Sequence, residues 1–308
     1  MAVAQVAADL RAVCRDVRER EPLQRHVSFR VGGPADVLVV PRSVEELRAV
    51  AAALFARRLP FVVLGQGSNV LIADAGIRGV VVKIGKGPDQ FAFDGERLRA
   101  QAGAGLPHLA RAAADHGLGG LEFAAGIPAS IGGAVVMNAG AHGHAMDEVV
   151  EGVEIVDGSG ARRLRADELA YAYRTSRLQR EPAVVVDATL RLGRGDPAAI
   201  RARTETWLRQ RSETQPIGPP SSGCVFRNPP GDHAGRLVDL AGGKGLAVGG
   251  ARVSDVHANY IINTGGATAA DVVTLAHKVK TLVAEKLGMV LEPEIKLLGE
   301  FEAPIETI

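Results

Sequence analysis

The chain has 308 residues, and its 36 basic and 35 acidic side chains leave a net charge of +1, which gives no argument for binding nucleic acid or a membrane surface. With 46% hydrophobic and 23% charged residues, the composition is that of a globular protein of two or three domains and excludes a disordered chain. The two cysteines, Cys14 and Cys224, are too few for a disulfide framework or a metal cluster, so we expect a protein of the reducing cytoplasm without a bound metal.

The N-terminal part predicts an amphipathic helix followed by a strand–helix–strand unit. The first 20 residues carry charges throughout, which fits neither a signal peptide nor a membrane span. A buried strand over residues 36–40 precedes a helix that Ser43 and Glu46 begin as a capping box. The next strand covers residues 61–64, and this order of elements implies a locally parallel sheet.

The turn after this strand is rich in glycine and reads LGQGSNVL over residues 64–71. Small residues after a strand leave backbone N–H groups and a short hydroxyl where a phosphate can sit. No GxGxxG or GxxxxGK[ST] pattern occurs in the chain, so a Rossmann or P-loop nucleotide site is disfavoured.

Beyond Pro88 the pattern becomes that of an antiparallel sheet. Two hairpins are predicted, over residues 91–98 and 149–165, because each has an Asp-Gly turn between strand-like segments. A helix begins at Leu106 between them. We therefore place a domain boundary near residue 86.

The stretch from Gly117 to Gly143 has the densest run of glycines, eight in 27 residues, and hardly any charge. Glycine at this density does not suit an ordinary helix or strand, and the apolar remainder indicates burial rather than a flexible linker. Buried backbone with free N–H groups suits a large anionic cofactor such as a dinucleotide. A tightly packed structural turn is the alternative for any single glycine-rich loop.

The C-terminal third predicts a strand over residues 183–192 and a helix that starts at Pro197. A segment rich in proline and serine, residues 215–235, predicts an exposed loop that carries a thiol, with a second boundary near residue 210. A long helix over residues 268–288 follows, with a Thr–Asp cap and a terminal glycine.

Seven blocks of the sequence resemble one family when taken together. The chain is similar to the UDP-N-acetylenolpyruvoylglucosamine reductases, flavoenzymes of bacterial cell-wall synthesis. Each block is weak alone, but seven in the family's order, from about residue 26 to the C-terminus, form a specific pattern. The blocks are FRVGGPAD, LGQGSNVLI, LEFAAGIPASIGGAVVMNAGAHG, YRTS, SSGCVFRNP, VSDVHANYIIN and LEPEIK.

The resemblance implies an α+β fold, with a two-subdomain FAD-binding part of the vanillyl-alcohol-oxidase type and a C-terminal substrate domain. The implied domains are residues 1–86, residues 87–210 joined by the C-terminal segment 291–308, and residues 211–290. We expect a monomer that binds neither nucleic acid nor membrane.

The resemblance also implies a reaction, the NADPH-dependent and FAD-mediated reduction of UDP-N-acetylglucosamine enolpyruvate to UDP-N-acetylmuramate, a peptidoglycan precursor. Hydride would reach C3 of the enolpyruvyl group from flavin N5, and a proton would reach C2. Arg174 matches the family's carboxylate-polarising arginine, Cys224 its proton donor, and Glu294 the glutamate that assists protonation or orients the acid.

These residue types suit these roles. The planar guanidinium of Arg174 fits two carboxylate oxygens, and an ordinary thiol, with a pKa of about 8.5, retains a proton to donate at neutral pH. Without the resemblance, Arg174 reads as a surface arginine, Cys224 as a small core residue and Glu294 as a solvated charge.

The implied cofactor is non-covalently bound FAD, and Arg211 and Asn228 are implied to contact the substrate's diphosphate or nucleotide. His142 is the only residue close to the glycine-rich loops that could attach flavin covalently, and nothing else supports such a bond. His257 reads as a hydrogen-bonded structural histidine. The implied FAD-binding residues are Gly65, Gly67, Ser68, Asn69, Gly126, Ile127, Pro128, Ser130, Gly132, Gly133, Asn138 and Gly140.

One feature departs from part of the family. One branch of the family closes a tyrosine-bearing loop over the substrate. Here the tyrosines are Tyr171, Tyr173 and Tyr260, and the stretch between Arg174 and Cys224 is compact, which matches the branch that lacks this loop. The group that covers the uridine of the substrate is therefore left open by the resemblance. Two other functions remain open. A sugar or lactone oxidase on the same fold would consume oxygen without NADPH, and a non-catalytic nucleotide-binding protein would be colourless.

Overall fold

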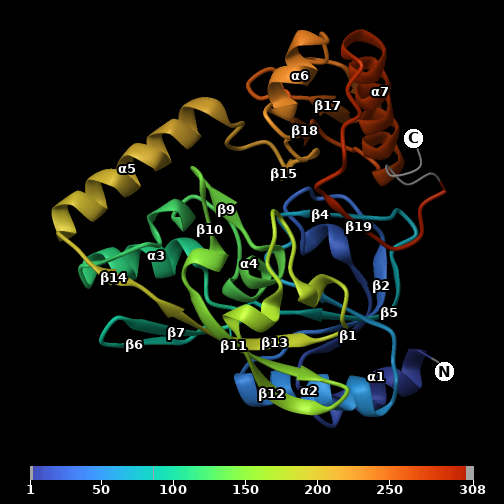
Figure 1. Ribbon diagram of the computed structural model, residues 1–308. Helices are drawn as coiled ribbons and strands as arrows, with labels where there is room; N and C mark the ends of the chain where they lie inside the picture. Colours follow the sequence, from blue (N-terminus) through green and yellow to red (C-terminus); the bar gives the residue numbers. More distant parts are fainter. Residues whose placement is uncertain (1–2, 86, 303–308) are drawn as a thin grey trace. The chain divides into compact units, whose positions relative to one another are not determined.

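The computed structural model describes residues 3–85 and 87–302, and the chain divides into two compact units (Figure 1). The first unit holds the described part of Met1–Glu19, Val37–Gln66 and Gly79–Arg211. The second holds Arg20–Asp36, Gly67–Arg78 and the described part of Ser212–Ile308.

The passage into the second unit at Ser212 lies close to the boundary expected near residue 210. The other expected boundary, at residue 86, falls outside the described residues. The division into three domains at residues 86, 210 and 290 therefore stays a prediction.

A five-stranded antiparallel sheet forms the centre of the first unit, in the order β12-β11-β13-β7-β6. Helices α2 (Val44–Ala56) and α4 (Ile131–Met137) pack against β13 from opposite faces (Figure 1). Because both faces are covered, every residue of β13 except Arg191 is buried. The strands are β6 (Phe91–Asp94), β7 (Arg97–Gln101), β11 (Val150–Asp157), β12 (Gly160–Arg165) and β13 (Val184–Arg191).

A second sheet has the order β1-β2-β5-β3. The predicted strand, helix and strand are present as β2, α2 and β3, but β2 and β3 are not neighbours in the sheet, and β3 instead pairs in parallel with β5, with Phe61 opposite Val80. Strand β5 lies between β2 and β3 in the sheet order, which the sequence pattern did not indicate. The strands are β1 (Val17–Pro22), β2 (Pro34–Val39), β3 (Phe61–Leu64) and β5 (Ile77–Lys83).

The start of α2 is only partly as predicted. The Ser43 hydroxyl accepts the Glu46 N–H at 3.2 Å, as a capping residue should. The Glu46 carboxylate, however, accepts the N–H of Arg42 at 2.8 Å, so it caps one residue earlier than a capping box requires.

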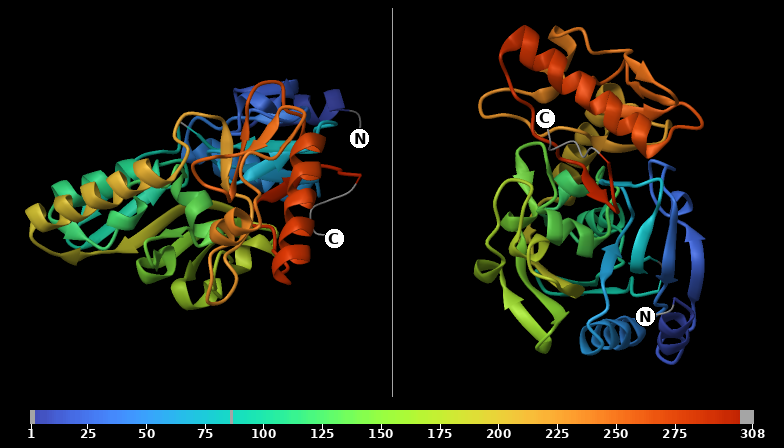
Figure 2. Two further views of the ribbon diagram at one scale, coloured as in Figure 1. Left: turned by 90° about the horizontal axis from the view of Figure 1, so that it is seen from above. Right: turned by 90° about the vertical axis from the view of Figure 1, so that its right-hand side faces the viewer.

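Among the remaining helices of the first unit, α1 and α3 each bury one apolar face, whereas α5 is long and straight with only Ile200 and Thr204 buried (Figure 2). Short elements connect them. These are α1 (Val3–Arg11), α3 (Leu106–Asp115), α5 (Pro197–Thr214), β8 (Leu118–Gly119), β9 (Gly140–Ala141), β10 (His144–Ala145), β14 (Gly193–Arg194), and the 3₁₀ turns η2 (Glu122–Ala124), η3 (Met146–Glu148), η4 (Ala166–Leu169) and η5 (Arg177–Gln179).

The second unit is built on a four-stranded sheet of order β15-β18-β17-β16, with α7 lying against β16, β17 and α6 (Figure 2). Thr268 and Asp271 cap α7 as predicted, and Gly288 ends it in a left-handed conformation. The elements are η1 (Leu23–Arg25), β4 (Val70–Ile72), β15 (Ser221–Cys224), α6 (Ala234–Leu240), β16 (Ala247–Val248), β17 (Ala251–Val253), β18 (Tyr260–Asn263), α7 (Ala269–Leu287) and β19 (Lys296–Leu298).

Two expectations for this unit need correction. The segment 215–235 is not a continuous exposed loop, because β15 pairs with β18 and places Cys224 opposite Tyr260. Strand β19, in the C-terminal segment, pairs in parallel with β4 rather than with a strand of residues 87–210. Among the described residues, no helix is both long and apolar enough to cross a membrane.

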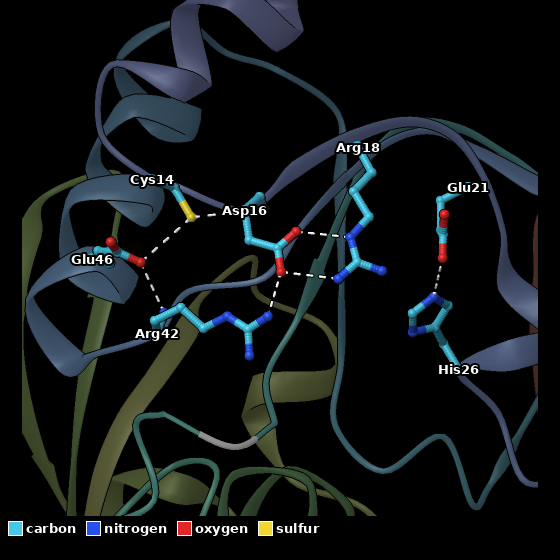
Figure 3. Close-up of polar contacts among 7 residues, drawn as sticks. All are labelled: Cys14, Asp16, Arg18, Glu21, His26, Arg42 and Glu46. Carbon is cyan, nitrogen blue, oxygen red and sulfur yellow. Dashed lines mark hydrogen bonds and ion pairs between the residues drawn. The ribbon is translucent and has the colours of Figure 1, made fainter.

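The two cysteines differ in environment. Cys14 is 3% exposed, and its sulfur lies 3.6 Å from Glu46 Oε2 and 3.9 Å from the Asp16 carbonyl oxygen (Figure 3). Burial raises the pKa of Cys14 to about 11. Cys224 is partly exposed, and neither cysteine forms a disulfide bond.

We therefore expect a thiol reagent to distinguish the two. Because the thiolate is the nucleophile, iodoacetamide at pH 8 should modify Cys224 in the native protein and leave Cys14 almost untouched. Mass spectrometry of peptides from briefly treated protein measures this, with urea-unfolded protein as the control in which both react. Equal labelling of both cysteines in the native state would contradict the buried setting of Cys14.

Candidate active site

The long glycine-rich stretch folds into η2, α4 and the β9–β10 hairpin of the first unit. Helix α4 begins at Ser130, whose hydroxyl accepts the Gly133 N–H at 3.4 Å. It ends at Asn138, which adopts a left-handed φ of 44°. The stretch is thus a tight turn, a short helix and a second turn rather than a loop.

Most of the glycines predicted to hold a cofactor are packed against the chain itself. A Cβ at Gly126 would lie 2.7 Å from Arg211 Cδ, and one at Gly132 would lie 3.1 Å from the Ala102 Cβ. At Gly140 a Cβ would collide with the His144 carbonyl oxygen. These three glycines have a structural reason within the fold.

Gly133 is different, because apart from its chain neighbours and the backbone of its own helix, the one described atom within 4 Å of a Cβ built there is Ser130 Oγ, at 3.5 Å. The same hydroxyl lies 2.6 Å from a Cβ built on Gly65, in the other glycine-rich loop. The fold therefore brings the two predicted cofactor loops together at Ser130. Open space beside glycine backbone, at the meeting of two small-residue loops, is a cradle that fits a bulky cofactor.

Lys83, at the end of β5, borders this region and was missed by the sequence analysis. Its ammonium group donates a hydrogen bond to the Gly65 carbonyl oxygen. Burial lowers its pKa to about 8. A single charged residue within the apolar run VVVKI, close in sequence to a glycine-rich turn, was the signal that could have identified it.

Arg174 lies in a tight turn between η4 and η5, and it is partly buried with a left-handed φ of 56°. Ala172 and Thr175 exchange two backbone hydrogen bonds across this turn, of 3.1 and 3.0 Å. The Asn138 side chain donates to the Ala172 carbonyl at 3.1 Å and accepts the Asp147 N–H at 3.0 Å. The amide of Asn138 thus supports the turn that carries Arg174, and its predicted contact with the cofactor stays a prediction.

The second unit brings together three segments that are far apart in sequence. The N–H of Glu294 donates to the Val225 carbonyl at 2.7 Å, which makes the backbones beside Cys224 and at Glu294 neighbours. The Asn69 side chain donates to the Glu294 carbonyl at 3.4 Å, and a Cβ built on Gly223 would lie 4.0 Å from the Ser68 carbonyl oxygen. Two predicted catalytic residues and one glycine-rich loop therefore meet here.

The predicted substrate residues have roles in local structure. Asn228 Oδ1 accepts the Ala234 N–H at 3.0 Å and so supports the start of α6. The Arg211 side chain lies over Gly126. Next to Asn228, the buried Nε of Arg227 has no hydrogen-bond partner among the described residues, which makes Arg227 a candidate anion contact that the sequence analysis missed.

His257 agrees with its expected role as a hydrogen-bonded structural histidine. His257 Nδ1 accepts the Asn259 N–H at 3.2 Å, and burial lowers its pKa, both of which favour the neutral ring. His142 stacks on Trp207 with ring centroids 4.9 Å apart. No group of three histidine, cysteine or acidic residues in the described parts of the chain could hold a metal ion.

The three tyrosines differ in their surroundings. Tyr260 donates to Gln215 Oε1 at 2.7 Å, and Tyr173 is 56% exposed. Tyr171 has a buried hydroxyl without a hydrogen-bond partner in the described structure, and burial raises its pKa. Which group covers the uridine therefore stays open.

Comparison with known sequences identifies two families along the chain. Residues 35–164 match the FAD binding domain family, and residues 215–298 match the C-terminal domain of UDP-N-acetylenolpyruvoylglucosamine reductase. The reductase of Moorella thermoacetica is 49% identical over 92% of this chain and 94% of its own length. The reductase of Heliobacterium modesticaldum is 46% identical over 94% of this chain and 94% of its own length.

The chain belongs to the UDP-N-acetylenolpyruvoylglucosamine reductase family. A solved structure agrees, since the reductase of Thermus caldophilus superimposes with a TM-score of 0.80 at 37% identity, over 92% of this chain and all of that one. This family member is therefore an oxidoreductase with FAD as its cofactor, on the α+β FAD-binding fold that the sequence predicted. A non-catalytic nucleotide-binding protein and an oxidase of another family are no longer alternatives.

The space beside Gly133 can be tested by substitution. Gly133→Leu should fold but purify with much less FAD than the wild type, because a side chain would enter the space next to Ser130. Flavin absorbance per chain measures this, and Gly193→Leu is the control, since a Cβ built at Gly193 likewise has room and meets no other described segment within 4 Å. A folded Gly133→Leu variant with a full complement of FAD would show that the cofactor does not use this space.

Proposed function

We propose that this protein catalyses the NADPH-dependent reduction of UDP-N-acetylglucosamine enolpyruvate to UDP-N-acetylmuramate, as a monomer in the cytoplasm. The observation that best supports this activity is the backbone hydrogen bond between Glu294 and Val225. It joins the segment of Cys224, the candidate proton donor, to the segment that carries the Glu294 carboxylate. Neither cysteine is in a disulfide bond, which is consistent with a reducing compartment.

The chemistry requires hydride at C3 of the enolpyruvyl group and a proton at C2. When bound, FAD supplies the hydride, having received it from NADPH. The substrate carboxylate then needs a cation, because negative charge develops on the conjugated C2–carboxylate system as C3 is reduced. We assign this role to Arg174, whose guanidinium carries a permanent charge and fits both carboxylate oxygens.

Cys224 is assigned as the proton donor. Its S–H bond breaks as the C2–H bond forms, which leaves a thiolate that water reprotonates before the next turnover. Glu294 orients the donor or relays its proton, in keeping with the backbone bond that joins its segment to the residue after Cys224. Arg211, Asn228 and Arg227 are the candidates for the substrate's diphosphate.

Arg174→Lys tests the carboxylate clamp. Lysine keeps the charge but loses the planar fork, so turnover of the enolpyruvyl substrate should fall about 10²-fold. Anaerobic stopped-flow absorbance should show flavin reduction by NADPH at a nearly normal rate. Wild-type turnover in this variant would remove Arg174 from the reaction.

Variants of Cys224 separate the two half-reactions. Cys224→Ala should leave flavin reduction by NADPH intact and slow reoxidation by the enolpyruvyl substrate by ~10²–10⁴-fold, because only that step needs a proton at C2. Cys224→Ser, which retains a proton to donate, is the control and should keep much of the activity. If Cys224→Ala reoxidises as fast as the wild type, the donor must be sought at Glu294 or at a water molecule that Glu294 orients.

A further inference from the structure

The side chain of Gln179, at the end of η5, makes two hydrogen bonds from one nitrogen. Its Nε2 donates to the carbonyl oxygen of Arg174 at 3.0 Å and to that of Val136 at 3.0 Å. An amide nitrogen has two hydrogens, so both are used. The two acceptors are 38 residues apart in sequence, and Gln179 joins them directly.

The Val136 carbonyl lies in the last turn of α4, where carbonyl groups have no partner within the helix. It also accepts the Ser176 hydroxyl at 2.7 Å, and Ser176 is completely buried. One carbonyl of α4 therefore anchors both Ser176 and Gln179. The turn that carries Arg174 is fixed to the helix whose first turn contains Gly133.

Arg174 needs such an anchor because of its backbone conformation. Its φ of 56° lies in the left-handed region, which is unfavourable for a residue with a Cβ and persists only where neighbouring contacts enforce it. The direction of the Cα–Cβ bond, and hence of the guanidinium, changes if the backbone relaxes. Gln179 is bonded to the carbonyl of this residue itself.

We infer that Gln179 is a positioning residue that holds Arg174 in its left-handed conformation and fixes the guanidinium relative to α4. The inference rests on the proposed role of Arg174. It explains why an amide is suited to this position, because a carboxylate cannot donate to two carbonyl oxygens and would be repelled by both.

Gln179→Met removes both donors at nearly constant size. In single-turnover, anaerobic stopped-flow experiments, reoxidation of the reduced flavin by saturating enolpyruvyl substrate should slow by about 10- to 100-fold, the effect of a misplaced reacting partner. Reduction by NADPH, flavin content and thermal stability should change little. Gln179→Glu, a second variant of the same shape, should lose at least as much.

The matched control is Arg180→Met, which changes an exposed neighbour in the same turn and should reoxidise like the wild type. The decisive comparison repeats Gln179→Met in an Arg174→Ala background. If Gln179 acts through Arg174, it should add no further loss there, whereas an independent effect should be equal in both backgrounds.

The outcomes separate the inference from the function on which it rests. Three results would overturn the positioning role of Gln179 and leave the proposed role of Arg174 intact. They are an equal loss in both backgrounds, an unchanged reoxidation rate in Gln179→Met, and equal slowing of the two half-reactions. Wild-type reoxidation by Arg174→Ala alone would instead overturn the proposed role of Arg174, and the positioning role with it. A loss confined to reoxidation and absent without Arg174 would establish the positioning role.

Discussion

Buried backbone must find hydrogen-bond partners, and in this protein the partners at the candidate site come from distant parts of the sequence. The Val136 carbonyl at the end of α4 accepts side-chain donors from Ser176 and Gln179. The Val225 carbonyl accepts the N–H of Glu294. Each bond satisfies a carbonyl and joins a segment that carries a predicted functional residue to a distant part of the chain.

This constraint also explains why glycine is so frequent in the chain. A Cβ at Gly140 would collide with the His144 backbone, and one at Gly126 or Gly132 would press on the Arg211 side chain or on Ala102. Gly133 has no such neighbour apart from a serine hydroxyl, so its small size serves the space beside it. A glycine-rich motif thus combines positions where the chain packs closely with a position that has open space beside it, and only coordinates separate the two.

Burial shifts the pKa values of two ionisable groups of the first unit, Cys14 and Lys83, in opposite directions. It raises the pKa of Cys14 to about 11 and lowers that of Lys83 to about 8, since each loses water around its charged form. Cys14 is thereby kept as an inert thiol in the core of the first unit. Lys83 places a readily neutralised cation against the Gly65 carbonyl, next to the cradle at Ser130.

The sequence by itself determined the features that depend on neighbouring residues and on family membership. Hairpins at Asp-Gly turns and the caps of α7 were correctly predicted, because these follow from local geometry. The family and its cofactor were recognised because seven short blocks occur in order.

The features that depend on pairing between distant segments of the chain were decided only by the tertiary structure. Three features rest on hydrogen bonds between distant segments, which no local pattern specifies. They are the insertion of β5 between β2 and β3, the pairing of β19 with β4, and the strand that ends at Cys224. The same holds for Lys83 and Gln179, whose partners are backbone carbonyl groups. Every residue carries such a carbonyl, so the sequence gives no sign of which one a side chain will bind.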